Sequence, residues 1–233
     1  MASKHNRRQA MKKLFIVVEG ETEERFLRKV LYNDFIQKGI HIEAQQWLTN
    51  RKLGIGGGGS NFDLIENHLR RLISRYQYDE NVFISVMVDL YAFPIGGNTV
   101  YDEEVINQQS GKNKVLLLQD KMNNRMQYQN FIPYVQLHEY EALLLSKPDA
   151  LLTFYTDKAQ EVEGLKAEIN GMNPEEINET PQGAPSKRII KYLPHYKKQK
   201  TTAGVTTAEK IGLPFLRQAC PHFNDWVTKL ESI

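Results

Sequence analysis

The sequence holds almost no cysteine and no long apolar run, and each scarcity removes a class of protein. Cys220 is the single cysteine, so an intramolecular disulfide and a cysteine-based zinc site are both excluded. No apolar stretch approaches the roughly 20 residues that a membrane-spanning helix needs, and the N-terminus lacks the apolar core of a signal peptide. These features predict a cytoplasmic protein with no membrane partner.

A large excess of charge of one sign is also lacking. The formal net charge is only +2, so the total charge gives no argument for nucleic-acid binding. The charges are nevertheless segregated, with seven acidic residues between residues 157 and 179 and six basic residues with no acidic one between residues 186 and 200. Such a basic segment could neutralise phosphates or form an ordinary solvated surface, and the sequence leaves both open.

The first half of the chain alternates segments typical of strands with segments typical of helices. Continuous apolar runs at residues 14–18 and 82–88 are expected for strands that are buried on both faces. Two further strands are predicted at residues 41–48 and 131–137. This alternation predicts an α/β fold with a parallel sheet covered by helices on both sides.

Hydrophobic residues at helical spacing fill the segments between these strands. They predict a helix that begins at a Thr22 cap and ends at Gly39, a second helix over residues 64–76 and a third over residues 115–126. Residues 91–112 are expected to form a long loop. The stretch "CPHFNDWVTKL" has the spacing of a packed C-terminal helix.

Three parts of the chain are expected from these patterns. Residues 1–10 are basic and predict a disordered extension, residues 11–146 form the α/β domain, and residues 147–233 form a helical C-terminal region packed on it. No internal repeat divides the chain further.

Ionisable residues stand at the ends of three predicted strands. Glu19 and Asp89 follow the first and third strands, while His138, Glu139 and Glu141 follow the fourth. Functional groups of open parallel sheets gather beyond the carboxyl ends of the strands. If the three strands are neighbours, the carboxylates converge, and they would repel one another unless a cation or a shared proton intervened. Magnesium suits such a place because it prefers oxygen ligands.

Each of these residues also has an ordinary structural interpretation. Glu19 could accept backbone hydrogen bonds in a turn, and Asp89 could cap the loop that follows it. His138 could be a buried histidine with satisfied nitrogens, and the two glutamates could favour the N-terminus of a helix. The shared position at one end of several strands favours the functional interpretation.

Two motifs resemble the TOPRIM domain of primases, topoisomerases and OLD-type nucleases. They are Glu19-Gly20 after an apolar strand and a later strand that ends at Asp89. From residue 14 to residue 231 the chain is similar to a bacterial family of TOPRIM-like proteins, domain-of-unknown-function family 4276. The resemblance is carried by "VEGETEERF", "GGGGS", "VMVDLYAFP", "FIPYVQLHEYEALLLS", "NPEEIN", "APSKRI" and "IGLPFLRQACPHFNDWVTKLE".

The resemblance implies a TOPRIM-like domain over residues 11–146 and a metal-dependent nuclease. In TOPRIM enzymes the first-strand glutamate is an acid–base or metal group, a role that falls on Glu19. Their third strand holds magnesium with an Asp-x-Asp pair, of which only Asp89 is present, since Tyr91 takes the second position and cannot replace a carboxylate. We hypothesise that the fourth strand completes the site. The predicted catalytic set is Glu19, Asp89, His138, Glu139 and Glu141, with Glu19, Asp89 and Glu141 as ligands of Mg²⁺ or Mn²⁺.

The remaining residues of the first motif have simpler interpretations. Gly20 is expected to let the chain turn away from the active-site carboxylate without crowding it. Glu21 is either a metal ligand or a residue behind the ligands. Glu23 and Glu24 are interpreted as charges that suit the N-terminus of the following helix.

Two other segments are predicted to contact nucleic acid. Backbone amides of "GIGGGGS" could hold a phosphate before a helix, although a flexible loop or a linker fits as well, and no Walker A lysine follows. "APSKRIIKYLPHYKKQK" mixes basic residues with tyrosines, which suits backbone contact and base stacking, and a solvated basic helix with core tyrosines fits equally. The predicted contacts are Gly57, Gly58, Ser60, Lys187, Arg188 and Lys191.

The sequence therefore supports two functions from different classes. The first is a Mg²⁺-dependent nuclease acting on DNA or RNA, which the resemblance places in a bacterial anti-phage defence or toxin-like system with an AAA/ABC-type ATPase partner. The second is a catalytically degenerate module that binds nucleic acid or the ATPase without cutting, a reading favoured by Tyr91. A homodimer is compatible with both.

Overall fold

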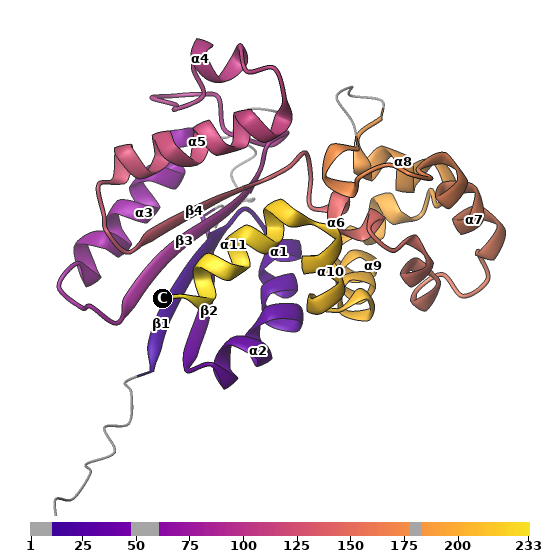
Figure 1. Ribbon diagram of the computed structural model, residues 1–233, viewed down its shortest axis with the longest axis horizontal. Helices are drawn as coiled ribbons and strands as arrows, with labels where there is room; N and C mark the ends of the chain where they lie inside the picture. The colour runs from indigo at the N-terminus through magenta and orange to yellow at the C-terminus, as the bar shows by residue number, and fades with distance from the viewer. Residues whose placement is uncertain (1–10, 48–60, 178–182) are drawn as a thin grey trace, which may run out of the picture.

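The computed structural model describes residues 11–47, 61–177 and 183–233, and its centre is a parallel sheet. The strand order is β2-β1-β3-β4, with every neighbouring pair parallel. The predicted α/β fold with a helix-covered parallel sheet is therefore confirmed (Figure 1). The strands are β1 (Lys12–Val18), β2 (Ile40–Gln46), β3 (Val82–Asp89) and β4 (Phe131–Gln136).

Alternate residues of β1 point into two separate cores. Leu14, Ile16 and Val18 belong to the core on one face of the sheet, and Phe15 and Val17 belong to the core on the other. Successive side chains of a strand point to opposite faces, so a strand with apolar residues throughout must be covered on both sides. This is why the sequence shows a continuous run rather than an alternating one.

The second core lies beneath α3 (Phe62–Tyr76) and α5 (Gly111–Met126), which cover the same face of the sheet (Figure 1). The predicted third helix begins four residues too late, because the Ser110 hydroxyl caps α5 by accepting from the Asn113 N–H at 3.1 Å. The predicted loop over residues 91–112 also contains a short helix, α4 (Glu103–Ile106). Leu64, the first residue of the predicted second helix, is 50% exposed, although the hydrophobic residues of that helix were expected on its packed face.

The first helical segment follows Glu19 directly and covers the opposite face. It consists of α1 (Glu21–Phe26), a π-helical turn η1 (Leu27–Leu31) and α2 (Tyr32–Gln37), and Gly39 follows with a positive φ of 77°. The cap predicted at Thr22 is wrong, because the helix already begins at Glu21, after Gly20. The Thr22 hydroxyl instead forms a 3.0 Å hydrogen bond with that of Thr201.

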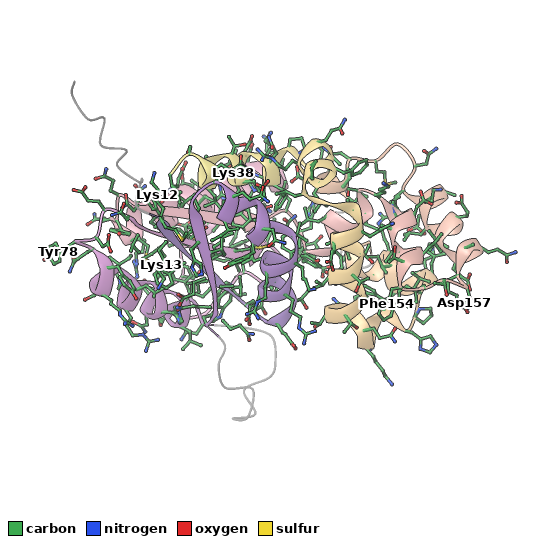
Figure 2. All side chains as sticks on the ribbon, turned by 90° about the horizontal axis from the view of Figure 1, so that it is seen from below. Lys12, Lys13, Lys38, Tyr78, Phe154 and Asp157 are labelled. Atoms are coloured by element: carbon green, nitrogen blue, oxygen red, sulfur yellow. The ribbon has the colours of Figure 1, made fainter. Side chains whose placement is uncertain are left out.

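The rest of the chain is helical, as predicted, and extends beyond the carboxyl end of the sheet. The long axis of the molecule runs from Tyr78 at one end to Asp157 at the other (Figure 2). The elements are α6 (Glu141–Leu145), η3 (Pro148–Thr153), α7 (Ala159–Glu168), η4 (Pro174–Glu176), α8 (Pro185–Tyr192), α9 (Tyr196–Ile211), α10 (Leu213–Ala219) and α11 (Pro221–Glu231).

The last helix, α11, returns to the sheet on the face that α1 covers (Figure 1). Its Trp226 is almost completely buried, stacks on Tyr134 of β4 and donates its indole N–H to the Ser85 hydroxyl at 3.1 Å. The packed C-terminal helix predicted from the sequence is confirmed. Among the described residues, no helix combines the length and apolar character that a membrane crossing requires.

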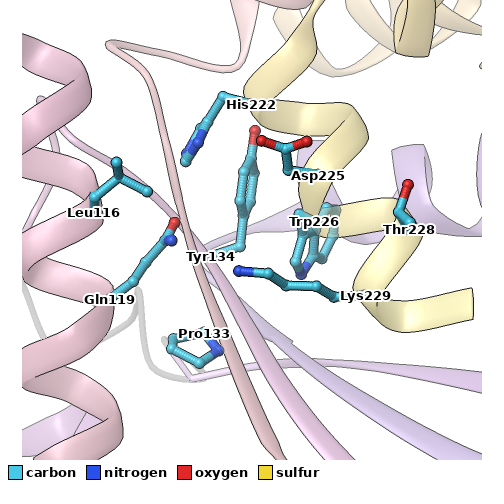
Figure 3. Close-up of a pocket in the computed structure, with 9 residues that line it drawn as sticks. All are labelled: Leu116, Gln119, Pro133, Tyr134, His222, Asp225, Trp226, Thr228 and Lys229. Atoms are coloured by element: carbon cyan, nitrogen blue, oxygen red, sulfur yellow. The ribbon is translucent and has the colours of Figure 1, made fainter. Parts of the chain in front are cut away.

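Side chains from two helices close the outer edge of β4. The Val135 N–H donates to the Gln119 side chain of α5 at 3.0 Å, and the Val135 carbonyl is 2.9 Å from Nε2 of His222 in α11. Pro133, on the same side of the strand, has no N–H. Gln119, Pro133 and His222 are among the residues that line a pocket of about 290 Å³ between α5, β4 and α11 (Figure 3).

Candidate functional site

Strand order places the ends of β1, β3 and β4 side by side. Val18 pairs with Met87, and Asp89 pairs with Gln136, so the residues that follow these strands leave the sheet at the same edge. Pairing continues past the regular strands, because the Tyr91 N–H donates to the His138 carbonyl at 3.1 Å. The condition for convergence of Glu19, Asp89 and the fourth-strand residues is therefore met. We call this the carboxyl edge of the sheet.

Asp89 is the last residue of β3 and carries an unusual carboxylate. Its Oδ1 atom is buried and has no hydrogen-bond partner in the described part of the chain. Loss of water raises the pKa of Asp89 well above its ordinary value, and the negative charges of Glu23, Glu141 and Glu19 raise it further. A backbone hydrogen bond from Tyr140 opposes this shift only in part. The charged form of Asp89 therefore lacks a counter-charge of its own.

Glu23 of α1 belongs to the same group of acids, which its sequence position did not reveal. Its Oε2 accepts the Gly20 N–H at 3.1 Å, the contact expected of a residue that caps a helix. Burial raises the pKa of Glu23, and the charge of Glu141 adds to the shift. The interpretation of Glu23 as a simple helix-terminus charge is therefore incomplete.

The structure also places the other residues of the first motif, Gly20, Glu21 and Glu24. Gly20 has an extended backbone with φ of −151°, and an added Cβ would meet nothing nearer than Glu23 Oε2 at 3.6 Å. The expectation that glycine avoids crowding the adjacent Glu19 stays a prediction. Glu21 pairs with Arg25 on the exposed side of α1, and Glu24 pairs with Arg28.

Glu141 reaches the carboxyl edge from the first turn of α6, as predicted. It is only 5% exposed, and its Oε1 accepts from Tyr196 at 3.3 Å and lies 3.0 Å from Lys200 Nζ. Burial raises the pKa of Glu141, while Lys200 opposes the shift. Both partners come from α9, which packs against α1 and α6. Lys200 lies in a basic run of the sequence, and nothing in that run distinguishes it from Lys197 and Lys198.

The two residues before α6 are held by their own contacts. Glu139 Oε2 accepts the Ser186 N–H at 2.9 Å, in the first turn of α8. His138 is buried and adopts a positive φ of 63°, a conformation rare outside glycine. Its ring lies 5.4 Å from that of Tyr91. A Cβ on Gly111 would come within 3.4 Å of His138 Cε1, so the start of α5 also approaches this turn closely.

The sequence profile of the family described as "Domain of unknown function (DUF4276)" matches residues 18–231. The chain belongs to this family. The resemblance predicted from the motifs is confirmed. The match covers β2, β3, β4 and the C-terminal helices, and it begins at Val18, the last residue of β1.

Solved structures give a weaker likeness. The chain is similar to two structures of the C-terminal region of the Xanthomonas campestris pv. campestris OLD protein, one phased with mercury and one with platinum, each at 11% identity. The first match covers 94% of this chain and 98% of that chain with a TM-score of 0.37, and the second covers 95% and 96% with a TM-score of 0.35. No curated protein gives a significant match.

The acids at the carboxyl edge of the sheet lie near one another. They are not arranged as a complete set of metal ligands. Within residues 11–47, 61–177 and 183–233, no three His, Cys, Asp or Glu side chains are grouped closely enough to hold a metal ion. The ligand set Glu19, Asp89 and Glu141 therefore stays a prediction. One observation fits a cation: the buried Asp89 Oδ1 has no partner and faces other carboxylates.

The predicted nucleic-acid contacts lie in two places. Gly57, Gly58 and Ser60 fall outside the described residues. Lys187 is exposed on α8, and the other two basic residues of α8 are already paired with Glu168: Arg188 at 2.9 Å and Lys191 at 2.5 Å. These pairs leave less free positive charge on α8 than the sequence indicates, and the predicted role of this helix stays a prediction.

The tyrosines of this region separate into two kinds. Tyr196 is fully buried and donates to Glu141, so the core interpretation holds for it. Tyr192 is half-buried and donates to Glu168 at 2.9 Å.

Proposed function

We propose that this protein is a Mg²⁺- or Mn²⁺-dependent nuclease whose active site is the carboxyl edge of the sheet. The observation that carries this proposal is the buried Asp89 oxygen without a hydrogen-bond partner, surrounded by the charges of Glu23, Glu141 and Glu19. A buried carboxylate costs several kcal/mol unless it is paired, protonated or bound to a metal. The first-strand glutamate and third-strand aspartate also match the TOPRIM motif.

The residues at this edge fit a hard divalent ion. Asp89 and Glu19 would hold it, with Glu141 contributing from the fourth-strand side. Magnesium often uses only one or two protein carboxylates and completes its shell with water and substrate phosphate, so a group of three ligands is not required. When bound, the ion would lower the pKa of a bound water and neutralise charge on the phosphodiester.

The chain itself would supply the remaining functions. The Gly20 N–H fixes the Glu23 carboxylate beside Asp89. Lys200 brings a positive charge to the same edge, where an anionic phosphate would bind. Glu139 holds the first turn of α8 through Ser186 and thereby positions the basic helix next to the site.

The wider assignment rests on the motif resemblance. We propose that the substrate is DNA or RNA, and that the protein is the cytoplasmic effector of an anti-phage defence or toxin-like system with an AAA/ABC-type ATPase. We also propose that residues 11–146 form the catalytic domain and that residues 147–233 form a helical region which completes its site with Lys200.

A cleavage assay tests the nuclease directly. Plasmid, linear DNA and tRNA are incubated with the protein in Mg²⁺ or Mn²⁺, with and without the proposed AAA/ABC-type ATPase partner. We expect cleavage that falls by about 100-fold or more in Asp89→Asn and in Glu19→Ala, because each removes a ligand of the ion. Asp120→Asn, an exposed aspartate on α5, is the matched control and should leave the rate within about twofold. Equal rates in Asp89→Asn and the wild type would refute the assignment.

A second function, binding without cleavage, is favoured by Tyr91, which stands in place of the second aspartate of the TOPRIM pair. Tyr91 is 43% exposed and lies against His138, where it offers an aromatic surface rather than a ligand. A catalytically degenerate module that binds nucleic acid or the ATPase would use this edge without cutting. Binding to these nucleic acids without cleavage under every condition would support the module.

A further inference from the structure

A lysine from the C-terminal region lies among the acids of the carboxyl edge. Lys200 Nζ is 3.0 Å from Glu141 Oε1, and that glutamate is almost fully buried. The charges of Glu141, Glu139 and Asp89 all act on Lys200, and Lys200 in turn acts on Glu23. The ammonium group therefore interacts electrostatically with several of these acids, although its direct contact is with Glu141.

The position of Lys200 is fixed by the packing of α9. The Thr201 hydroxyl bonds that of Thr22 on α1 at 3.0 Å, and Tyr140 donates its hydroxyl to the Gly204 carbonyl at 3.3 Å. A Cβ on Gly204 would lie 2.9 Å from the Tyr196 hydroxyl, so α9 approaches the site as closely as glycine permits. Lys200 is thus held in place, unlike its exposed neighbours Lys197 and Lys198.

The acids divide into two sets by what balances their charge. Glu141 already has an ammonium and a hydroxyl on Oε1. Asp89 has a backbone donor and one oxygen without a partner. The lysine ammonium is a compact, strongly hydrated point charge with three donors. A second divalent cation beside this ammonium would be repelled by its positive charge.

We propose that the Lys200 ammonium takes the place of a second divalent cation, so that the carboxyl edge binds one Mg²⁺ or Mn²⁺ ion per chain, on the Asp89 side. The inference rests on the proposed function for the identity of this edge as a metal site. The proposal also accounts for Tyr91, which stands where TOPRIM enzymes have the second aspartate of the Asp-x-Asp pair. A site in which a fixed lysine supplies one of the positive charges needs fewer carboxylates than a site for two ions.

Counting bound Mn²⁺ tests the proposal without reference to cleavage. The full chain is titrated with Mn²⁺, and free ion is measured by electron paramagnetic resonance. We expect one equivalent per chain for the wild type and for Lys200→Arg, and two for Lys200→Met. Lys197→Met, a lysine-to-methionine change on the exposed side of the same helix, is the matched control and should keep one equivalent. Two equivalents or none in the wild type, or fewer than two in Lys200→Met, would overturn the proposal.

A near-isosteric variant keeps the test valid if Lys200→Met does not fold. Glu141→Gln removes the carboxylate that balances Lys200 and leaves the ammonium facing the remaining acids. The single Mn²⁺ ion should then bind with about tenfold or more weaker affinity, because an uncompensated positive charge lies near it and the negative charge of Glu141 is lost. An unchanged Kd for Mn²⁺ in Glu141→Gln would contradict the inference.

The two proposals fail in different ways. A protein that binds one ion in the wild type and two in Lys200→Met, but cleaves no nucleic acid, would keep the lysine inference and refute the nuclease. A protein that cleaves with two ions bound beside an intact Lys200 would do the reverse.

Discussion

Two acids of this chain, the buried Glu175 and the half-buried Asp89 with its buried Oδ1 atom, have opposite surroundings. Glu175 is 3% exposed, and its two oxygens accept the N–H groups of His222 and Phe223 at 2.8 and 2.9 Å, in the first turn of α11. Burial still raises the pKa of Glu175, but these two donors oppose the shift. The carboxylate thus caps α11 from a distant part of the sequence and lies at the positive end of the helix.

Asp89 lacks such compensation. One of its oxygens is buried without a partner, three other acids raise its pKa, and the ammonium of Lys200, which also acts on it, is bonded to Glu141. A carboxylate with satisfied oxygens contributes to the fold, whereas a carboxylate with an orphaned oxygen weakens the fold and is available to a ligand. The contrast distinguishes a structural acid from a candidate functional one without reference to any relative.

The largest expected effect comes from removing the structural acid. Glu175→Ala leaves two buried N–H groups of α11 without acceptors, so we expect the free energy of unfolding to fall by about 3 kcal/mol. Urea denaturation followed by circular dichroism measures this loss. Glu176→Ala, at the exposed neighbouring position, is the control and should change the stability by less than about 0.5 kcal/mol. Equal effects of the two variants would remove the distinction drawn above.

Removing the positive charge at the carboxyl edge should have a smaller effect. Lys200→Met leaves Glu141 without its ammonium partner, and we expect a loss of about 1 to 2 kcal/mol, reduced by solvent because the Lys200 side chain is 39% exposed. The same denaturation experiment measures it, with Lys198→Met as the control. A stability equal to that of the wild type would show that the ion pair adds nothing to the fold.

Neutralising Asp89 should act in the opposite direction. Asp89→Asn keeps the shape of the side chain and removes a charge that loss of water and three neighbouring acids disfavour, so we expect the free energy of unfolding at pH 7.5 to rise by about 1 kcal/mol. Thermal denaturation in the presence of a chelator measures the gain. A lower Tm for this variant would mean that the charged form is balanced in the folded protein after all.

The smallest effect is the pH dependence of that gain. The folded pKa of Asp89 lies above its unfolded value, so ionisation favours the unfolded chain, and its cost grows as the pH rises from the unfolded pKa through the folded one. The difference in Tm between Asp89→Asn and the wild type should therefore be near zero at about pH 4 and largest at pH 8. A difference that is constant with pH would show that the gain has another origin.

Local patterns predicted much of the fold. The apolar runs at residues 14–18 and 82–88 could only be strands covered on both faces, and the acids that follow them lie where parallel strands end. Asp89 was identified for this reason. The start of α5 at Gly111 was missed because the Ser110 cap stands before a polar turn that carries no hydrophobic signal.

Residues that reach the site through packing could not be found in this way. Glu23 looks like a helix-capping acid because it is one, and only its burial beside Asp89 adds a second role. Lys200 lies in the same basic run as Lys197 and Lys198, and what separates them is the side of α9 on which each side chain lies. Neither property is encoded in spacing along the chain.

The closed edge of β4 also limits how this chain can assemble. An incoming strand would find no donor at Pro133 and would find both backbone groups of Val135 already bonded to Gln119 and His222. Sheet extension from this side would require breaking both bonds and moving two helices. Fibril growth and strand exchange are therefore blocked at β4, and a partner that approaches from this direction must recognise side chains rather than complete the sheet.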